Sequence, residues 1–250
     1  MKKEQRGATM TRIRFRFARG KELCYLSHLD MLRLFQRAMR RAALPLAFTQ
    51  GFSPRPRFSL AAPLPVGATA AKEYGEVDLA EPLEPVSFLR RLGEQLPAGL
   101  ALTGAVTVPP GAPSLAAEVN AALYHAFWRE EGTAPPAEAL QEALDRLLAQ
   151  RQIMVRRPGR KGQAGEQDIR PFIFSAGLLP PGENGLALRL LLQVGSKGGL
   201  APFRLLEQLL PEAKEPAEHL WRLHRQGLYI YRKETLAEPF PEGGGWKAHG

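Results

Sequence analysis

Arginine is the residue whose type and spacing most clearly point to chemistry in this chain. The segment 28–43 has apolar residues at helical spacing, and four arginines form a stripe opposite or beside them: Arg33, Arg37, Arg40 and Arg41. No carboxylate follows Asp30 there, so the helix supplies no i,i+4 partner for these cations. A guanidinium forms two parallel hydrogen bonds with a phosphate and stacks on bases, which favours a nucleic acid. A solvated basic face is the alternative, and the helix alone favours neither.

Two further segments combine cations with aromatic rings or with a loop tip. Phe52, Arg55 and Arg57 lie in a proline-stiffened segment, 48–57. Aromatic rings beside guanidiniums are typical of proteins that hold single-stranded RNA by stacking and by phosphate contacts. Alternatively, Phe52 and Phe58 fill the core under this loop. The segment 156–161 could clamp a nucleic-acid backbone with four cations: Arg156, Arg157, Arg160 and Lys161.

The elements that must position these residues begin with a strand. Residues 11–18 alternate between apolar and cationic side chains, which predicts a half-buried strand. Its outer face is expected to carry three arginines: Arg12, Arg14 and Arg16. Ser27 is expected to cap the helix that follows, with Asp30 as the acidic partner of a capping box.

The basic residues are concentrated at the N-terminal end of the chain. The formal charge is +9, from 34 Lys and Arg against 25 Asp and Glu. Residues 1–60 hold fourteen Lys or Arg and three acids, which gives this segment +11 and leaves −2 for the rest. Such a basic block is typical of proteins that bind a polyanion. A basic face that docks an acidic protein is the competing interpretation.

The sequence contains no motif that names a reaction. It lacks a phosphate-binding GxxxxGK[ST] loop, a GxGxxG turn, an HExxH pair and a GxSxG elbow. Cys24 is the single cysteine, which excludes a cysteine-based zinc site or iron–sulfur cluster, and we expect neither a metal nor a cofactor. His28 is a weak candidate for a general base beside the cationic surface. The favoured alternative is that His28 orders the turn at 25–30 by local hydrogen bonds.

No segment resembles a membrane span. The best apolar run, 186–194, is interrupted by Arg189 and Gln193 and is far shorter than the roughly 20 residues that a span needs. We therefore expect a cytoplasmic protein without membrane contact.

The order of the predicted elements indicates an α+β fold of two tandem ferredoxin-like (βαββαβ) sandwich domains. The first domain is expected at 10–110, with strands at 11–18, 57–61, 73–80 and 100–108 and helices at 28–43 and 85–96. The second, with one extra strand, is expected at 114–236, with strands at 118–129, 153–157, 169–177, 186–194 and 227–232 and helices at 136–150 and 202–210. Residues 1–9 are expected to be a disordered leader, with Met10 as an alternative start, and residues 237–250 a disordered tail.

The linker at 109–113 is short and rich in proline, so the two domains should pack side by side around a cleft. We expect the basic strand, the arginine helix and the 48–57 segment to lie on or beside that cleft, because only a compact arrangement focuses their field. The 156–161 tip could reach the same side.

Several stretches together resemble a known bacterial family. They are LSHLD at 26–30, RAMRRAALPL at 37–46, GFSPRPR at 51–57, APLPVG at 62–67, EY at 73–74 and DIRP at 168–171. This pattern is similar to the radical-SAM-linked (radical-SAM-associated) family of unknown function, whose members stand beside, or are fused behind, a B12-binding radical SAM enzyme. The chain has Ser53 and Arg55 where that family has Asn and His.

The resemblance implies a partnership with such an enzyme rather than a reaction. A radical SAM cluster needs three cysteines, so this chain cannot itself be the radical enzyme. We expect a non-catalytic accessory protein that binds tRNA or rRNA for the radical SAM partner. Two alternatives stay open. One is a metal-independent RNA-processing or RNA-modifying enzyme with His28 as its base, by analogy of fold with CRISPR repeat endonucleases and pseudouridine synthases. The other is a protein–protein adaptor for the radical SAM enzyme.

Overall fold

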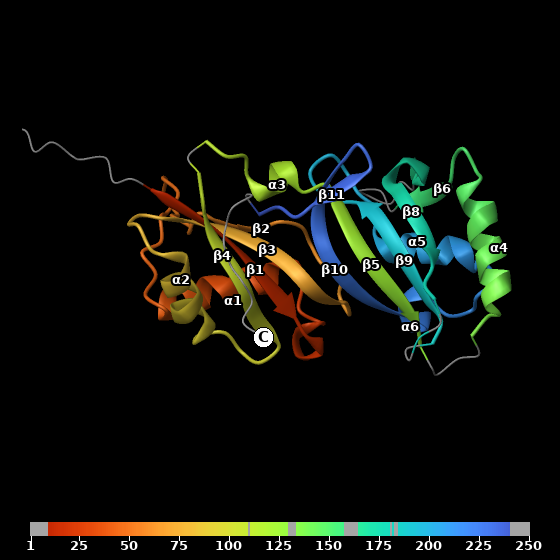
Figure 1. The fold of residues 1–250 in the computed structure, drawn as a ribbon, viewed down its shortest axis with the longest axis horizontal. Helices are drawn as coiled ribbons and strands as arrows, with labels where there is room; N and C mark the ends of the chain where they lie inside the picture. The colour runs from red at the N-terminus through yellow and green to blue at the C-terminus, as the bar shows by residue number, and fades with distance from the viewer. Residues whose placement is uncertain are drawn as a thin grey trace, which may run out of the picture.

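The computed structural model describes residues 10–109, 111–129, 134–157, 165–180, 182 and 185–240 of the 250-residue chain. In these residues one mixed sheet of nine strands, mostly antiparallel, runs through the whole molecule, with a separate two-stranded hairpin. Figure 1 shows the elongated shape that results, with the two ends of the sheet built from the two halves of the chain. The predicted α+β class is confirmed.

The first half contributes the strands at one end of the sheet. Their order is β4-β1-β3, with the short β2 added to β3, and each neighbouring pair is antiparallel. Two helices pack beside them, and a single helical turn, α3, follows the last strand. The elements are β1 (Thr11–Arg19), a 3-10 turn (Lys21–Leu23), α1 (His28–Arg41), β2 (Phe58–Leu60), β3 (Thr69–Leu79), α2 (Pro85–Gly93), β4 (Leu100–Val108) and α3 (Leu115–Glu118).

The second half continues the sheet in the order β10-β5-β9-β8, again with antiparallel neighbours. A hairpin of β6 and β7 is inserted between its first helix and β8, and β11 folds back onto β10. The elements are β5 (Ala121–Trp128), α4 (Ala137–Leu148), β6 (Met154–Arg157), β7 (Gly165–Asp168), a 3-10 turn (Arg170–Phe172), β8 (Ile173–Leu178), β9 (Ala187–Gln193), α5 (Pro202–Leu209), α6 (Ala217–Leu220), β10 (Trp221–Arg232) and β11 (Thr235–Ala237).

The two halves join through a parallel contact between β3 and β10. Thr69 lies opposite His224 and Ala70 opposite Arg225. The sheet therefore passes from one half to the other without a break. The finer assignment as two ferredoxin-like sandwiches stays a prediction.

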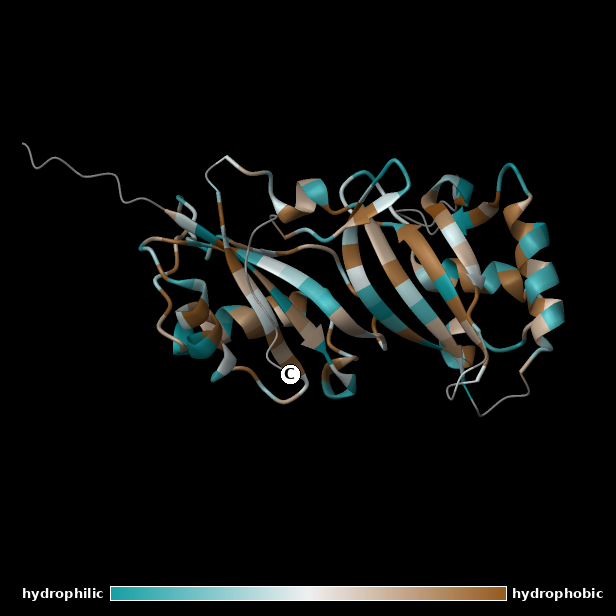
Figure 2. Cartoon of the chain, viewed as in Figure 1, coloured by the Kyte–Doolittle hydropathy of each residue, from teal (hydrophilic) through white to brown (hydrophobic). Residues whose placement is uncertain are grey.

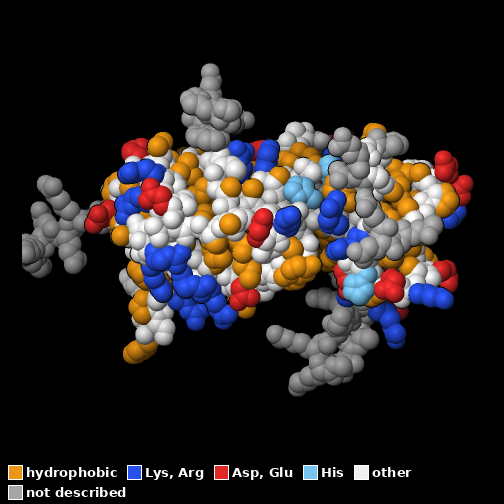
Figure 3. Space-filling model, turned by 90° about the horizontal axis from the view of Figure 1, so that it is seen from below, with side chains coloured by type: hydrophobic (Ala, Val, Ile, Leu, Met, Phe, Trp, Pro, Cys, Tyr) orange, Lys and Arg blue, Asp and Glu red, His pale blue; other side chains and the backbone are white. Residues whose placement is uncertain are grey.

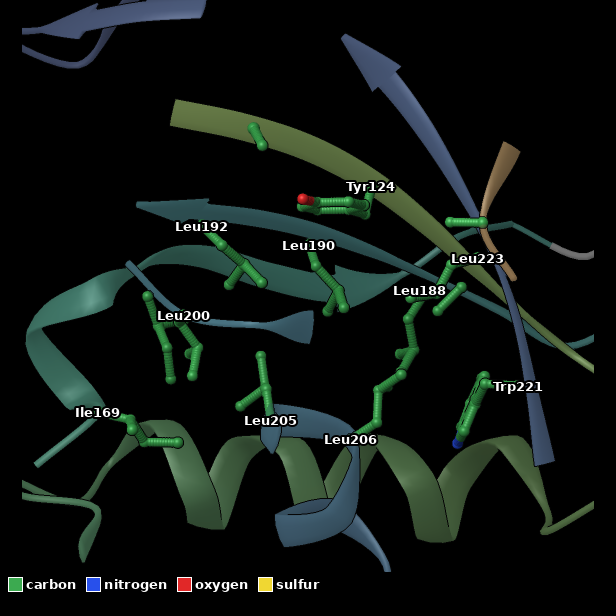
Figure 4. Packing of buried hydrophobic residues seen from close by; sticks show 14 of the residues in the cluster. Tyr124, Ile169, Leu188, Leu190, Leu192, Leu200, Leu205, Leu206, Trp221 and Leu223 are labelled. Carbon is green, nitrogen blue, oxygen red and sulfur yellow. The ribbon is translucent and has the colours of Figure 1, made fainter. Parts of the chain in front are cut away.

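Strand alternation places the apolar side chains of both halves on the helix side of the sheet. Figure 2 shows the alternation as bands of opposite hydropathy along the strands. In the first half Phe15 and Phe17 of β1 pack on Phe35 of α1, with ring centroids 5.5 and 4.9 Å away. In the second half leucines of β9 meet Leu205 and Leu206 of α5, as Figure 4 shows.

Several predicted boundaries differ from the observed ones for identifiable reasons. The predicted strand at 169–177 begins late, because Pro171 belongs to a 3-10 turn that separates β7 from β8. The predicted closing strand at 227–232 is longer and begins at Trp221. The expectation of a disordered tail is wrong for 237–240, since β11 ends at Ala237 and the next three residues contact the sheet. The predicted leader 1–9 and residues 241–250 lie outside the described residues.

Candidate functional site

The N-terminal cap of α1 fixes which way the helix presents its arginines. The amide of Asp30 donates to Ser27 Oγ at 3.2 Å, and Ser27 Oγ donates to Asp30 Oδ2 at 2.7 Å, so the predicted cap is confirmed. Phe35 and Met39 lie on the buried side of the helix with Met31 and Ala38. The predicted arginine stripe is consequently on the exposed side.

All four arginines of α1 are exposed, and two of them have no partner in the described part of the chain. Arg33 is 3.4 Å from Asp30 within the same helix, a contact that solvent screens. Arg41 donates to the carbonyl of Gln95 at 2.6 Å. Arg37 and Arg40 have neither an ion pair nor a hydrogen bond through their side chains within the described part of the chain. Figure 3 shows Lys and Arg side chains gathered in one patch at the end of the molecule that holds α1.

The 48–57 segment lies at the same end of the molecule and points an aromatic ring into solvent. Its two arms are joined by a hydrogen bond from Thr49 N to the Arg55 carbonyl at 2.9 Å. Phe52 at its tip is fully exposed, so it is not a core residue. Phe58, by contrast, packs on Phe15 and Phe35. The Arg55 side chain is exposed and has no partner among the described residues, whereas Arg57 pairs with Asp78 at 3.1 Å.

The expectation of an open cationic face on β1 is wrong. Arg12 and Arg14 face away from α1 and α2, on the outer side of β1 as predicted, but carboxylates meet them there. Arg12 Nε lies 2.9 Å from Asp78 on β3, and Arg14 Nη2 lies 3.0 Å from Glu118 on α3 and 3.4 Å from Glu76 on β3. Because only 4% of Arg14 is exposed, it cannot reach a large polyanion.

Arg16, the third arginine of β1, is covered by the end of the described chain. Its Nη1 lies 2.9 Å from Glu238, and its guanidinium stands over the Phe240 ring at 5.5 Å. Glu238 also binds Lys72 and accepts a hydrogen bond from the Tyr74 hydroxyl at 3.2 Å. Burial disfavours the Glu238 carboxylate, but Lys72 and Arg16 outweigh it, so the pKa of Glu238 lies below its ordinary value.

Of the second predicted basic tip, the described residue Arg156 is far from α1. Arg156 is exposed on β6, at the end of the molecule opposite to α1 in Figure 1, and its carbonyl accepts a hydrogen bond from Arg204. Arg157 ends β6. Arg160 and Lys161 lie outside the described residues. For Arg156, the expectation that the tip reaches the same side as the arginine helix is wrong, since the second half of the sheet separates them.

A cleft of about 1020 Å³ lies between the halves, as expected, but the basic block does not line it. The first half contributes Tyr25 and Val66, and the second contributes Phe203 and Arg204. Three glutamates and one further arginine and histidine complete the charged wall: Glu207, Glu215, Glu218, Arg129 and His219. The mixture of signs gives this cleft no net preference for a polyanion. No residue of the basic strand, the arginine helix or the 48–57 segment lines it, so the expectation that these elements lie on the cleft is wrong.

His28 occupies a position unsuited to catalysis on a phosphodiester. It is half-buried and lines an internal space of only about 10 Å³ together with Arg19 and Glu73. Burial lowers the pKa of His28, and the nearby Arg225 lowers it further, so the imidazole stays neutral at neutral pH. A space of this size holds no more than a water molecule.

The most buried charged group in the described structure was missed by the sequence reasoning. Arg225 on β10 is completely buried and reaches Glu73 on β3, with Nε 2.6 Å from Oε1. Tyr124 and two carbonyls, of Ala62 and Pro63, accept its other hydrogen bonds. Burial disfavours the cation, but Glu73 and Tyr124 outweigh that effect, and the pKa of Arg225 lies above its ordinary value. The one signal in the sequence was the charge of Glu73 within a predicted strand, since Arg225 lay outside the predicted strand 227–232.

The described residues contain no group of three or more His, Cys, Asp or Glu side chains placed to hold a metal ion. Nor does any helix of the described part have the length and apolar character needed to cross a bilayer.

Comparison with known proteins places the chain in a family. Among solved structures it is similar to a chain in the crystal structure of a Cbf5-Nop10-Gar1 complex, with 10% identity and a TM-score of 0.41. The match covers 87% of this chain and 47% of that one, so this chain spans about half of its length, and a likeness this weak carries no argument. No curated protein matches. A family model described as an uncharacterized protein conserved in bacteria (DUF2344) matches residues 12–202. The chain therefore belongs to this bacterial family.

Proposed function

We propose that this chain is an accessory protein that binds RNA through the exposed arginines beside its 48–57 segment. We call this the α1 basic surface and define it by five residues: Arg33, Arg37, Arg40, Arg41 and Arg55. The observation that carries the proposal is that Arg37 and Arg40 are exposed on one helix face and have no partner among the described residues. Like charges at this spacing repel, and a polyanion removes that repulsion.

An exposed ring favours RNA over an acidic protein as the ligand. Phe52 is fully exposed at the tip of a proline-stiffened loop, at the same end of the molecule as the α1 basic surface. A ring in water gains from stacking on a base, and the neighbouring arginines can hold the phosphates on either side. An acidic protein would pair with the arginines, but such pairing gives no reason for an exposed ring at Phe52.

We propose in addition that the RNA is a tRNA or rRNA and that the partner is a B12-binding radical SAM enzyme. The resemblance of the 26–30, 51–57 and 62–67 stretches supports this partnership. With Cys24 as its single cysteine, the chain would supply binding, and the partner would supply the cluster.

We also propose that each half is a ferredoxin-like unit. The strand orders β4-β1-β3-β2 and β10-β5-β9-β8 support this, since both follow from a βαββαβ chain with its second and third strands adjacent.

A salt titration tests the RNA proposal. The affinity for tRNA is measured by fluorescence anisotropy at several salt concentrations for the wild type and for Arg37→Gln/Arg40→Gln. Each lost phosphate contact should reduce the slope of log K against log salt by about 0.7–0.9. Arg151→Gln is the matched control, because Arg151 is equally exposed but lies beyond α4 at the other end. An unchanged slope in the double variant would refute the assignment of this surface.

The same experiment separates RNA from an acidic protein. Phe52→Ala should weaken binding to single-stranded RNA without changing the salt slope, since it removes stacking and no charge. If Phe52→Ala binds RNA as the wild type does, while a radical SAM partner is lost from Arg37→Gln/Arg40→Gln, the surface is a protein-docking face instead.

A further inference from the structure

The side of the sheet opposite α4 and α5 has an unusual composition in the second half. The strands β5, β8, β9 and β10 contain no Asp or Glu. Strand alternation sends Tyr124 and Leu223 to the buried core and their neighbours His125 and Arg222 to the other side. We call this other side the second-half outer face and define it by six residues: His125, Phe127, Ser175, Arg189, Arg222 and His224.

Cross-strand register brings the cations, histidines and ring of this face together. On β5 and β10, His125 lies opposite His224 and Phe127 opposite Arg222, while on β9 Arg189 lies opposite His125. The Arg222 guanidinium stands over the Phe127 ring at 5.4 Å, and the His125 ring meets the same ring edge-on at 6.1 Å. These residues are separated in the sequence, which is why no local pattern reveals the cluster.

Hydrogen bonds fix the polar side chains in place without neutralising them. His224 Nδ1 lies 2.7 Å from Thr69 Oγ1, and His125 Nδ1 lies 3.0 Å from Gln226 Nε2. Arg189 donates to Ser175 Oγ at 3.4 Å. Among the described residues, neither Arg189 nor Arg222 has a carboxylate within ion-pair distance. The face therefore carries positive charge with no internal counter-charge.

The corresponding side of the first half is closed. There α3 and the residues 238–240 cover Arg14 and Arg16 and supply carboxylates to both. In the second half Arg222 is exposed, and His125, His224, Phe127 and Arg189 are half-buried, as expected for a sheet face without a covering layer. The contrast leaves one open, cationic sheet face on the molecule as described.

The chemistry of this face fits a ligand with negative charge and flat rings. Neighbouring strands are about 4.8 Å apart and same-side residues on one strand about 6.7 Å apart, so four strands offer room for two or three bases. Aromatic rings on four-stranded sheets of this kind stack bases of single-stranded RNA, and guanidiniums pair with the phosphates between them. An acidic peptide would pair with the cations of this face but would offer no flat ring to stack on its aromatic side chain.

We propose that the second-half outer face is a second RNA-contact surface, which binds the bases of a single-stranded segment through Phe127, Arg222 and the two histidines. The proposal rests on the proposed function for the class of ligand, but not on the α1 basic surface. Since α1 packs on the helix side of the sheet and this face lies on the other, the two surfaces contribute separately and can be removed separately.

The test compares probes of equal charge. An RNA single strand of about 12 nucleotides, an abasic strand of the same length and an RNA duplex are titrated against the full chain. Phe127→Leu/Arg222→Lys retains apolar volume and charge but removes the ring and the planar guanidinium. We expect this variant to bind the single strand about tenfold more weakly and the abasic strand within twofold of the wild type. Arg232→Lys, an exposed arginine at the end of the same strand, is the matched control.

The outcomes separate this proposal from the proposed function. Equal affinity of the wild type for the single strand and the abasic strand would overturn it, as would displacement of the single strand by oligoglutamate at equal charge concentration. If only Arg37→Gln/Arg40→Gln loses RNA, the second surface is refuted and the α1 basic surface stands. If only Phe127→Leu/Arg222→Lys loses RNA, the reverse holds. A urea midpoint equal to that of the wild type shows that each variant is folded.

Discussion

The ion pair between Glu73 and Arg225 is the interaction whose loss should damage the fold most. Glu73 stands on β3 of the first half and Arg225 on β10 of the second, so the pair lies where the two parts of the sheet join. The perturbation is Glu73→Gln, which keeps the size of the side chain and removes its charge. Arg225 then keeps its hydrogen bonds to Tyr124 and to backbone carbonyls but loses the one carboxylate that pairs with it among the described residues.

The size of the expected loss in the free energy of unfolding follows from the burial of both side chains. The Arg225 side chain is 0% exposed and the Glu73 side chain 7%, so neither charge can turn to solvent when its partner is gone. Breaking a buried pair from one side costs about 3–5 kcal/mol, because the remaining charge stays desolvated. A total stability of roughly 5–15 kcal/mol would therefore fall by about a fifth or more. An exposed pair on α4, Glu142 with Arg146, has both side chains more than 70% exposed and should contribute less than about 0.5 kcal/mol.

Urea unfolding followed by far-UV circular dichroism measures the free energy of unfolding for Glu73→Gln, Arg225→Met, the double variant and the control Glu142→Gln. The double variant removes both charges, so it should be more stable than the sum of the two single losses predicts, by about 2 kcal/mol. If Glu73→Gln costs no more than Glu142→Gln, burial does not set the strength of this pair and the reasoning fails.

Three further outcomes follow from other contacts. Ser27→Ala should lower the free energy of unfolding by about 1 kcal/mol, measured in urea, because it removes the cap of α1. Burial lowers the pKa of His28, His125 and His224 below the unfolded value, so the unfolded chain binds more protons at acidic pH. Stability should therefore fall as pH drops below about 6.5, and His-to-Gln replacements should flatten that dependence in urea melts. Glu238→Gln should raise the salt concentration needed to elute the protein from heparin, because it frees the two cations that Glu238 pairs with.

Local sequence patterns were sufficient where the structure depends on neighbours in the chain. The cap at Ser27 and the buried side of α1 follow from residues within one or two turns, and both are confirmed. The alternation at 11–18 placed Phe15 and Arg14 on opposite sides of β1 correctly. What the alternation could not supply was the partner of Arg14, because Glu76 and Glu118 lie 62 and 104 residues away in sequence.

The contact that joins the two halves could not be predicted from the sequence for the same reason. The parallel contact of β3 with β10 connects residues more than 150 positions apart, and two paired positions give no periodic signal. Glu73 was visible as a charge in a predicted strand, but Arg225 lay outside the predicted strand 227–232, and without the register the two could not be matched. The break between β7 and β8 was different, since Pro171 was available as a local marker and the predicted strand ran through it.

Segment charge is a poor measure of the charge a sheet presents, and the two halves of this molecule show why. The +11 of residues 1–60 includes Arg12, Arg14 and Arg16, yet each of these three meets a carboxylate. The strand register places an acidic residue of β3 opposite Arg12 and opposite Arg14. Arg16 lies opposite Tyr74 instead, and Glu238 supplies its carboxylate. The later residues sum to −2, yet their strands β5, β8, β9 and β10 contain no acid, so an open face among them is cationic. Cross-strand neighbours decide the local field because they lie about 5 Å apart, well inside the screening length of about 8–10 Å. A polyanion therefore meets the second-half outer face as a positive surface, although the residues after position 60 sum to −2.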